Sequence, residues 1–472
     1  MSLPYLISLI SVLCLFALGV GIAFRAAATS RTAPGAVAWV ISLIAAPYLA
    51  IFLWFFFGSH RFSDYYSLRR NSEALAGGLE RYRHAHAPRK ETGDTLFRDF
   101  EPIAQLPVVS NNDAHVLING QDTFDAIFAA CDAARHYLLV QFYTIEDDDL
   151  GRALRDRLIA AARRGVSVRL LYDQIGSYGL PAGYRDSLQA GGVIVMDPAR
   201  TQGPRSRLRV NFRNHRKTVV VDGQIGFVGG LNVGDAYMGR GKRFATWRDT
   251  HLRLSGPIVS QLQLVFCEDW HWSMGETLFD QLNWHATEQP ADLNALIVAT
   301  GPGDVQETGS LYFFALIGAA RDRLWIASPY FVPDTDILTA LIHAAMRGVD
   351  VRILVPDGVD HWTPWLAAFA YFDEITAAGV QVWRYQPGFM HQKVVLVDDR
   401  IAAIGTTNLD NRSFRLNFET AALLFDQGMA EQVATMLRAD FDQAERMTRT
   451  LAQQPFWIRL LAPVARLFSP LL

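Results

Sequence analysis

The residues best suited to chemistry in this 472-residue chain are a histidine and a lysine two positions apart. His391 and Lys393 precede the apolar run Val394 to Val397, which is bounded by acidic residues and predicts a strand entering a tight turn. Side chains two apart on a strand share a face, so the imidazole and the ammonium should project together. Asp398 has the opposite parity and lies at the turn, which indicates a structural role.

The return strand and the residues after it complete the motif. Ile401 to Ile404 predicts that strand, which ends in Gly405, Thr406 and Thr407, small residues that let the backbone approach a ligand. Asn408 follows, and its amide can bind an oxyanion. One such motif would be weak evidence, because a histidine and a lysine on one strand are usually solvated surface residues.

The motif, however, occurs twice. The earlier copy has the same internal spacing and consists of His215, Lys217, Asp222, Gly229 and Asn232. The two histidines lie 176 positions apart, within longer repeats. Two copies at identical spacing indicate a duplicated functional site rather than a surface strand.

Two histidines, two lysines and two asparagines can together cleave a phosphodiester through a covalent phosphohistidine. One imidazole would attack phosphorus, and the second would protonate the leaving alkoxide. Cations would bind the phosphorane oxygens, on which negative charge develops. The sequence has no cluster of Asp, Glu and His at metal-ligand spacing, so we expect the lysines to replace a metal ion and expect no cofactor.

The doubled pattern His-x-Lys-x4-Asp-x6-Gly, with an asparagine three residues later, resembles the phospholipase D superfamily. Arg213 to Lys217 and Asn408 to Glu419 are similar, more specifically, to bacterial cardiolipin synthases. The resemblance implies that His215 is the nucleophile and His391 the general acid, and that Asn232 and Asn408 bind the substrate phosphate. It also implies one catalytic set, made of His215, Lys217, Asp222, His391, Lys393 and Asp398. The family's usual Gly-Ser is Gly-Gly and Gly-Thr here, so a serine hydroxyl near the phosphate is not expected.

A nucleophilic histidine also needs a carboxylate that fixes its tautomer through the other ring nitrogen. Asp249 and Glu419 are the candidates, and each begins an apolar strand behind its own motif, 34 and 28 residues after the histidine. The superfamily has a carboxylate at comparable positions. The alternative is a solvated acid at a strand end, and the duplication favours the functional interpretation.

Two apolar runs near the N-terminus predict membrane spans. Leu3 to Phe24 and Gly35 to Phe57 have 22 and 23 residues without a charge, and about 20 apolar residues cross a bilayer. The first run lacks a preceding basic region, which disfavours a signal peptide. Two spans would form a helical hairpin with both ends on one side. More arginines follow the hairpin than lie in its loop, which favours a cytoplasmic catalytic body. The resemblance implies that the membrane is a bacterial inner membrane.

The remainder of the chain is an internal repeat of strands and helices. Residues 137–143 correspond to 324–330, 164–171 to 347–354, and 192–195 to 379–382, and each series leads into its histidine–lysine motif. Strand–helix alternation predicts an α/β fold with helices covering a mixed sheet. With the resemblance, this predicts two tandem phospholipase D-like α/β sandwich domains in a pseudo-two-fold arrangement.

The expected divisions of the chain are a transmembrane hairpin (1–58), a juxtamembrane linker (59–106), a first domain (107–285) and a second domain with an apolar C-terminal tail (286–472). Several segments allow two interpretations. The linker could instead contact anionic lipid at the interface, and the tail could lie in that interface or dock onto the body. Trp362 to Phe372 is either a core helix or the wall of a lipid channel. The basic run of Arg205, Arg207, Arg209, Arg213, Arg216 and Lys217 could steer an anionic headgroup or be a solvated loop.

Composition limits the function classes. A net charge of −3 excludes a globally basic nucleic-acid binder, and three scattered cysteines predict neither a disulfide framework nor a CxxC metal site. The resemblance implies a membrane-bound phosphatidyltransferase that makes cardiolipin and glycerol from two phosphatidylglycerol molecules. The alternatives are a hydrolytic phospholipase D, a nuclease of the same superfamily, in which two spans would serve no purpose, and a non-catalytic lipid-binding scaffold, in which a motif histidine or lysine is usually lost. The oligomeric state stays open.

Overall fold

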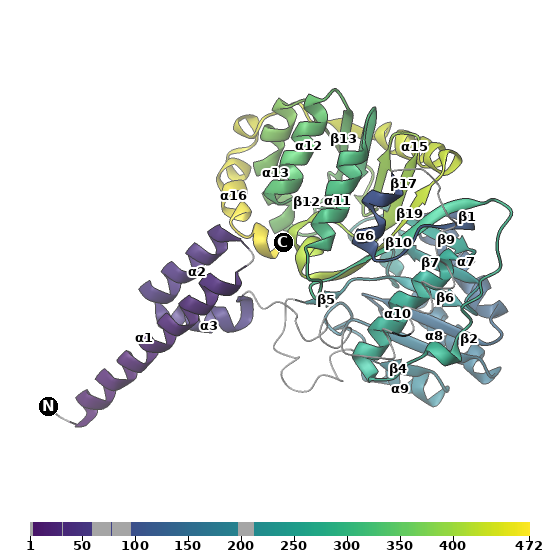
Figure 1. The fold of residues 1–472 in the computed structure, drawn as a ribbon, viewed down its shortest axis with the longest axis horizontal. Coiled ribbons are helices and arrows are strands. Elements are labelled where there is room, and N and C mark those ends of the chain that lie inside the picture. The colour runs from purple at the N-terminus through teal and green to yellow at the C-terminus, as the bar shows by residue number, and fades with distance from the viewer. Residues whose placement is uncertain (1–2, 31, 59–76, 78–95, 197–211) are drawn as a thin grey trace.

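The computed structural model of the chain describes residues 3–30, 32–58, 77, 96–196 and 212–472. Most of the predicted juxtamembrane linker therefore lies outside the described residues, as do Arg205, Arg207 and Arg209 of the basic run. The described part consists of an apolar N-terminal arm and a two-part α/β body (Figure 1).

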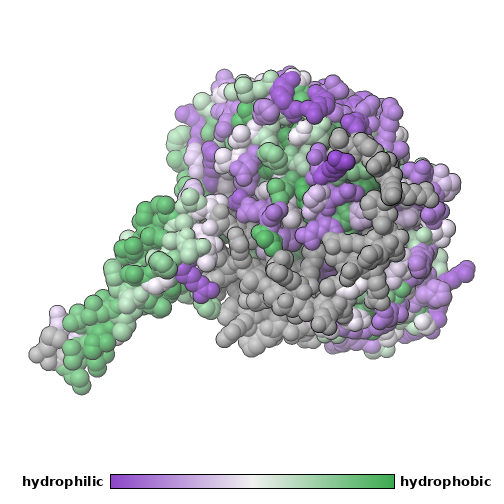
Figure 2. Space-filling view, viewed as in Figure 1, coloured by the Kyte–Doolittle hydropathy of each residue, from purple (hydrophilic) through white to green (hydrophobic). Residues whose placement is uncertain are grey.

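The arm is formed by α1 (Leu3–Thr29), α2 (Ala33–Ala45) and α3 (Pro47–Phe57), and most of the face seen in Figure 2 is apolar. The first predicted span forms one helix, α1, which is long and apolar enough to cross a membrane. The second predicted span differs, because the helix ends before Pro47, which lacks a backbone N–H and instead starts α3. The rings of Trp39 and Trp54 lie 5.0 Å apart, so α3 folds back along α2.

Within the described residues, 16 strands form one mixed sheet that runs through both halves of the body. Its centre is built from antiparallel strands: β1 (Val109–Ile118), β9 (Thr250–Ser255), β10 (Leu293–Thr300) and β19 (Asn417–Phe425). β1 pairs with β10, so the boundary between the two predicted domains is crossed by main-chain hydrogen bonds.

Each half then adds a hairpin and three parallel strands on its outer side. In the first half these are β6 (Thr218–Val221) and β7 (Ile225–Gly229), followed by β2 (Tyr137–Phe142), β3 (Ser167–Tyr172) and β4 (Ile194–Met196). In the second half they are β16 (Val394–Val397) and β17 (Ile401–Gly405), followed by β11 (Arg323–Ala327), β13 (Asp350–Pro356) and β14 (Gln381–Tyr385), with β20 (Ala444–Arg446) at the edge. The predicted repeat of strands and the pseudo-two-fold order are therefore present.

Helices cover both faces of the sheet (Figure 1). The first half carries α7 (Asn119–Ala133), α8 (Asp149–Arg163), α9 (Ala182–Ala190) and α10 (Ile258–Met274). The second half carries α6 (Glu101–Ala104), α11 (Thr308–Ala319), α12 (Thr335–Met346), α13 (Trp362–Ala377), α14 (Asn411–Arg415), α15 (Gln427–Phe441) and α16 (Phe456–Arg466). α13 is a core helix, because Leu366, Phe369 and Phe372 are buried; the lipid-channel interpretation is not needed for this segment.

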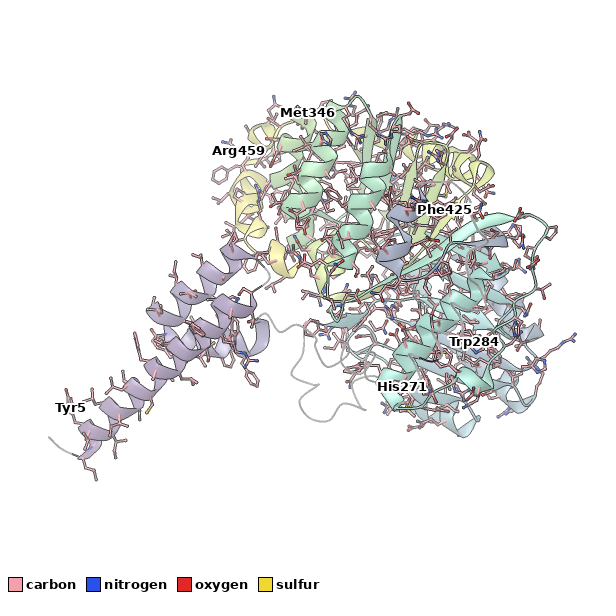
Figure 3. All side chains as sticks on the ribbon, in the orientation of Figure 1. Tyr5, His271, Trp284, Met346, Phe425 and Arg459 are labelled. Carbon is pink, nitrogen blue, oxygen red and sulfur yellow. The ribbon has the colours of Figure 1, made fainter. Side chains whose placement is uncertain are left out.

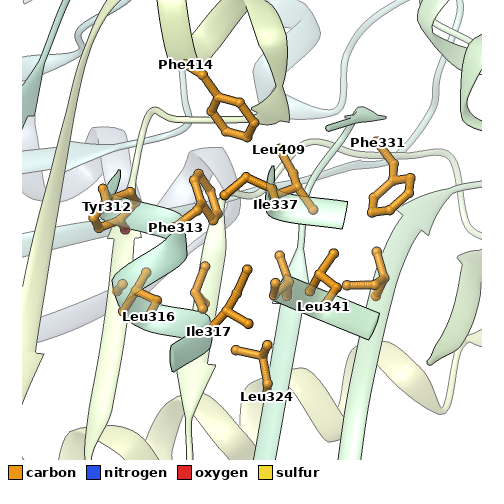
Figure 4. Packing of buried hydrophobic residues seen from close by; sticks show 14 of the residues in the cluster. Tyr312, Phe313, Leu316, Ile317, Leu324, Phe331, Ile337, Leu341, Leu409 and Phe414 are labelled. Atoms are coloured by element: carbon orange, nitrogen blue, oxygen red, sulfur yellow. The ribbon is translucent and has the colours of Figure 1, made fainter. Parts of the chain in front are cut away.

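Close packing holds the loop after the second motif in place. Leu409 follows Asn408 directly and Phe414 lies six residues after it, and both are buried among side chains of α11, α12 and β11 (Figure 4). Phe414 packs against Phe313 with ring centroids 5.3 Å apart. Side chains fixed in this way lose little further freedom on binding a ligand, which suits a loop that must position an amide.

Candidate active site

The two motif histidines meet at the junction of the two halves, and short strands bring them there. β5 (Arg213–Asn214) ends just before His215 and pairs in parallel with the first residues of β19. β15 (Phe389–Met390) ends just before His391 and pairs in parallel with β8 (Trp247–Arg248), which itself ends just before Asp249. The predicted parity placed each histidine and lysine on the following strand; both pairs instead lie in the extended connection that immediately precedes β6 or β16.

Each histidine is held by a carboxylate from the opposite repeat. Nδ1 of His215 lies 2.9 and 3.0 Å from the two carboxylate oxygens of Glu419. Nδ1 of His391 lies 2.8 Å from Oδ2 of Asp249. The sequence predicted both carboxylates but paired each with the histidine of its own motif, and the structure corrects that pairing. The reason is the strand pairing across the junction, which aligns each histidine with the other half's carboxylate strand.

Neighbouring side chains fix the two carboxylates, which are fully buried. Glu419 accepts hydrogen bonds from the Thr406 hydroxyl at 2.5 Å and from Nδ2 of Asn417 at 3.1 Å. Asp249 accepts one from the backbone N–H of Thr250 at 2.8 Å, and Gly230 lies so close that a Cβ there would be 2.0 Å from Oδ1 of Asp249. Glycine at this motif position is therefore required by the approach of the carboxylate.

Burial sets the protonation of this cluster. It lowers the pKa of both His215 and His391 to about 4, so the imidazoles are neutral at pH 7. Burial alone would raise the pKa of Asp249 and Glu419, but the histidine and lysine beside each lower it below the usual value. A neutral imidazole facing an ionised carboxylate carries its proton on Nδ1, which makes Nε2 the acceptor nitrogen of the ring.

The two lysine side chains are buried inside the same site. Nζ of Lys217 donates to the backbone carbonyl of His215 at 2.6 Å and lies 5.3 Å from the ring centre of Tyr143. Nζ of Lys393 lies 3.0 Å from both ring nitrogens of His391. Burial lowers the pKa of Lys393 to about 8 and that of Lys217 well below its usual value. Each lysine acts electrostatically on the other repeat's histidine, so the halves form one site.

The two asparagines differ in their surroundings. Asn232 accepts a hydrogen bond from the backbone N–H of Thr144 at 3.1 Å and donates to the Tyr237 hydroxyl at 3.2 Å. An amide group has two N–H donors, so Asn232 can keep the latter bond and still donate to a phosphate oxygen. Oδ1 of Asn408 is buried and has no hydrogen-bond partner among the described residues.

The two motif aspartates lie outside the catalytic cluster. Asp222 accepts hydrogen bonds from the backbone N–H groups of Arg135, His136 and Tyr137. Asp398 does the same for residues 321–323. Both adopt a left-handed backbone, with φ of 53°. The expectation that both aspartates belong to the catalytic set is therefore replaced by a structural role: they tie each hairpin turn to the start of the neighbouring strand, as the parity of Asp398 indicated.

The residue between each histidine and lysine anchors the motif, a role that sequence reasoning missed. Arg216 is buried and its Nη1 lies 2.5 Å from Asp269 on α10, so it is not part of a solvated basic run. Gln392 donates to Asp440 on α15 at 2.8 Å, and Asp440 also pairs with Arg248. Odd parity relative to the histidine was the available signal, because such a side chain must point away from the site.

These features define the phospholipase D class: a duplicated α/β sheet whose halves each supply a histidine, a lysine and the other half's carboxylate. A family model described as the cardiolipin synthase, phospholipase D-like domain matches residues 127–270 and 313–443. Cardiolipin synthase A of Pseudomonas putida KT2440 is 44% identical over 99% of this chain and 98% of its own length. That of Pseudomonas entomophila L48 is also 44% identical, with the same coverage.

Among solved structures, a phosphatidylserine synthase of Haemophilus influenzae aligns with a TM-score of 0.60 and 16% identity, covering 80% of this chain and 100% of that one. This likeness supports the fold of the body. The chain belongs to the cardiolipin synthase family of the phospholipase D superfamily. It is a phosphatidyltransferase of phospholipid biosynthesis, and its substrates are phospholipids.

Proposed function

We propose that the enzyme transfers a phosphatidyl group from one phosphatidylglycerol to a second, forming cardiolipin and glycerol through a phosphohistidine on His215. The observation that carries the proposal is the pair of neutral imidazoles, each with Nδ1 held by a buried carboxylate. One imidazole can then act as nucleophile while the other transfers protons.

In the first half-reaction, Nε2 of His215 attacks phosphorus and the bond from phosphorus to the glycerol headgroup oxygen breaks. Nε2 of His391 gives a proton to that oxygen, and glycerol leaves. The negative phosphate of the bound lipid offsets the burial that otherwise lowers the pKa of His391, so this imidazole is protonated in the complex. Lys217, Lys393, Asn232 and Asn408 stabilise the charge on the phosphorane oxygens.

In the second half-reaction, neutral His391 removes the proton from a glycerol hydroxyl of the second phosphatidylglycerol. The hydroxyl oxygen attacks phosphorus, the bond from phosphorus to Nε2 breaks, and His215 is restored. One phosphodiester replaces another, so no nucleotide is needed, and the equilibrium should lie within a few kcal/mol of balance. A cytoplasmic body on the inner membrane, where phospholipid is abundant, completes the proposal.

Incubation with cardiolipin and excess glycerol tests the function directly. The transferase should run backward and yield phosphatidylglycerol, identified by mass spectrometry, with little phosphatidic acid. A hydrolytic phospholipase D would yield mainly phosphatidic acid, and that result would replace the proposal with hydrolysis. His215→Ala and His391→Ala should each abolish turnover, whereas His343→Ala, on exposed α12, is the matched control and should leave it unchanged.

A further inference from the structure

The C-terminal helix α16 exposes an apolar surface that its packing on the body does not explain. Ile458, Ala462 and Ala465 dock it onto the second half, against α13. At 100° per residue, these three occupy one narrow sector of the helix. The remaining apolar side chains stay exposed: Phe456, Trp457, Leu460, Leu461, Val464, Leu467 and Phe468.

These exposed side chains form one uncharged surface, here named the α16 face. They fall within an arc of about 140°, whereas Arg459 and Arg466 lie on the opposite edge of the helix. Phe456 is 75% exposed, Leu460 58% and Leu467 78%. Isolated exposed apolar residues are ordinary, but a contiguous group of this kind indicates an interaction surface.

The α16 face continues toward the active site through aromatic contacts. The ring of Trp457 lies 6.0 Å from Trp362 and is stacked on Trp365 at 6.1 Å. Trp362 begins α13, two residues after Asp360, and Asp360 accepts a hydrogen bond from Tyr330 at 3.1 Å. This edge of the sheet, where β11 and β13 end, is also where β16 begins beside Lys393.

The surroundings identify the occupant of the α16 face. α16 lies on the flank of the body nearest the apolar arm, and Figure 2 shows apolar residues there next to the arm. Arg459 is exposed at the outer edge of the helix (Figure 3). An amphipathic helix with aromatic and leucine residues on one side and arginines on the other is typical of helices that lie in a membrane interface.

We propose that the α16 face docks into the surface of the lipid bilayer and brings the rim of the active site to the headgroups. The arm alone tethers the body, but a tether leaves the orientation of the site free. A second contact at α16 fixes that orientation, so lipid headgroups can reach the histidines without leaving the membrane. The proposal concerns membrane contact and does not depend on the phosphohistidine mechanism.

Depth-dependent quenching tests this contact in the full chain. A fluorophore is attached to Leu460→Cys or Val464→Cys in a Cys14→Ala background, since the other two cysteines are buried. Proteoliposomes contain phosphatidylglycerol and lipids with a nitroxide near the headgroup. The control is Met346→Cys, 75% exposed at the end of α12, where β13 begins and therefore opposite the site. Quenching at 460 and 464 but not at 346 is expected.

Equal, weak quenching at all three positions would overturn the proposal. Energy transfer between labelled copies without lipid quenching would place a second copy on the face and would also overturn it. As an independent measurement, Leu460→Glu should lower turnover of bilayer substrate by roughly three- to tenfold, yet leave turnover in detergent micelles unchanged. Met346→Glu should affect neither, and equal loss in both media would contradict a membrane role.

A second inference concerns the path of the arm through the membrane. α2 and α3 have 13 and 11 residues, about 20 and 16 Å, so neither spans a hydrocarbon layer of about 30 Å. The turn between them packs on α1 at Gly19, where a Cβ would lie 2.9 Å from the carbonyl oxygen of Leu43 and 3.1 Å from Cβ of Pro47. A helix break inside the hydrocarbon layer requires that its unpaired backbone groups be shielded from lipid by protein.

We infer that α2 and α3 form a re-entrant pair, so that α1 is the span that places the N-terminus opposite the body. Arg25, near the end of α1, agrees with this path. In a two-span hairpin, Arg25 would lie across the membrane from the body, whereas in the re-entrant arrangement it lies on the side of the body, as expected for a basic residue on a cytoplasmic side.

Labelling with a membrane-impermeant maleimide tests the path in full-chain protein with Cys14→Ala. Leu3→Cys, Thr32→Cys and Met346→Cys are compared in right-side-out and inverted vesicles. Thr32 and Met346 should react from one side and Leu3 from the other. Reaction of Leu3 and Met346 from the same side, with Thr32 opposite, would establish the two-span hairpin and overturn the re-entrant path.

Discussion

The crossed pairing of histidines and carboxylates can be tested through the covalent intermediate. With His391→Asn, the proposed phosphatidyl–His215 adduct should form and persist, because no group remains to activate the second alcohol. Glu419→Gln and Asp249→Asn are then added separately to this background. Asn at position 391 can still donate a hydrogen bond to Asp249, which keeps the buried carboxylate satisfied.

The expected magnitude follows from the contacts of Glu419. Its carboxylate accepts from Nδ1 of His215 at 2.9 Å, and a hydrogen bond to a charged partner contributes about 1.5–3 kcal/mol. It is also the largest influence that favours the charged form of buried Lys217, whose pKa burial lowers. Loss of both effects predicts about 2–4 kcal/mol in the barrier to adduct formation, roughly 30- to 1000-fold. Asp249→Asn should cost less than about threefold, because its partner histidine is already absent.

A phosphatidyl ester of p-nitrophenol suits the assay, because its leaving phenolate needs little protonation. The burst of nitrophenolate in stopped flow reports adduct formation, and acid-labile radiolabel on the protein confirms it. Glu419→Gln should slow the burst, and Asp249→Asn should not. The reverse order of effects would show that each carboxylate serves the histidine of its own repeat. If the acid-labile radiolabel persists on the His215→Asn protein but not on the His391→Asn protein, then His391 is the nucleophile and His215 the general acid.

Four further predictions follow from burial and contacts. Because burial lowers the pKa of Lys393 to about 8, kcat/KM should fall above about pH 8. The fall in kcat should begin at a higher pH, since the bound phosphate favours the ammonium form of Lys393. Burial lowers the pKa of both histidines from 6.5 to about 4, so between these pH values the unfolded chain binds more protons than the folded chain. The free energy of unfolding should therefore be highest above pH 6.5. It should fall by roughly 3 kcal/mol per histidine as the pH falls to about 4, which thermal melting measures. Asp222→Ala should lower stability by about 2–4 kcal/mol with unchanged turnover per folded molecule, and Asp222→Asn by less. Turnover should continue in chelator, whereas complete loss restored by one divalent ion would contradict the metal-free chemistry.

The motif strands could be predicted from sequence because their signal is local. Val394 to Val397 forms β16 as expected, and the glycine that ends each hairpin lies where backbone must pass close to a neighbouring strand. The break in the second apolar run also had a local signal in Pro47, at the middle of a segment treated as uniform. The apolar composition of this run did not by itself predict where the helix breaks.

The partner of each carboxylate had no local signal. Asp249 and Glu419 lie 34 and 28 residues after the histidines of their own repeats, so sequence distance favours the wrong pairing. The correct pairing depends on how two similar halves dock, which is set by the antiparallel pairing of β1 with β10 and by β5 and β15 crossing the junction. Such contacts join residues about 140–200 positions apart, and no period in the sequence records them.

Because each histidine is paired with the other half's carboxylate, the two copies of the motif have different surroundings. Neither half contains a complete histidine–carboxylate pair, so in the proposed mechanism each half depends on the other. The two pairs also differ: a glutamate fixed by Thr406 and Asn417 holds His215, whereas a shorter aspartate holds His391, whose ring nitrogens lie beside the Lys393 ammonium. The Lys393 ammonium disfavours a positive charge on His391, so in the proposed mechanism His391 gains its proton only when the bound phosphate offsets that charge. The assignment of His215 as nucleophile and His391 as acid stays a prediction, and the labelling of His391→Asn and His215→Asn tests it.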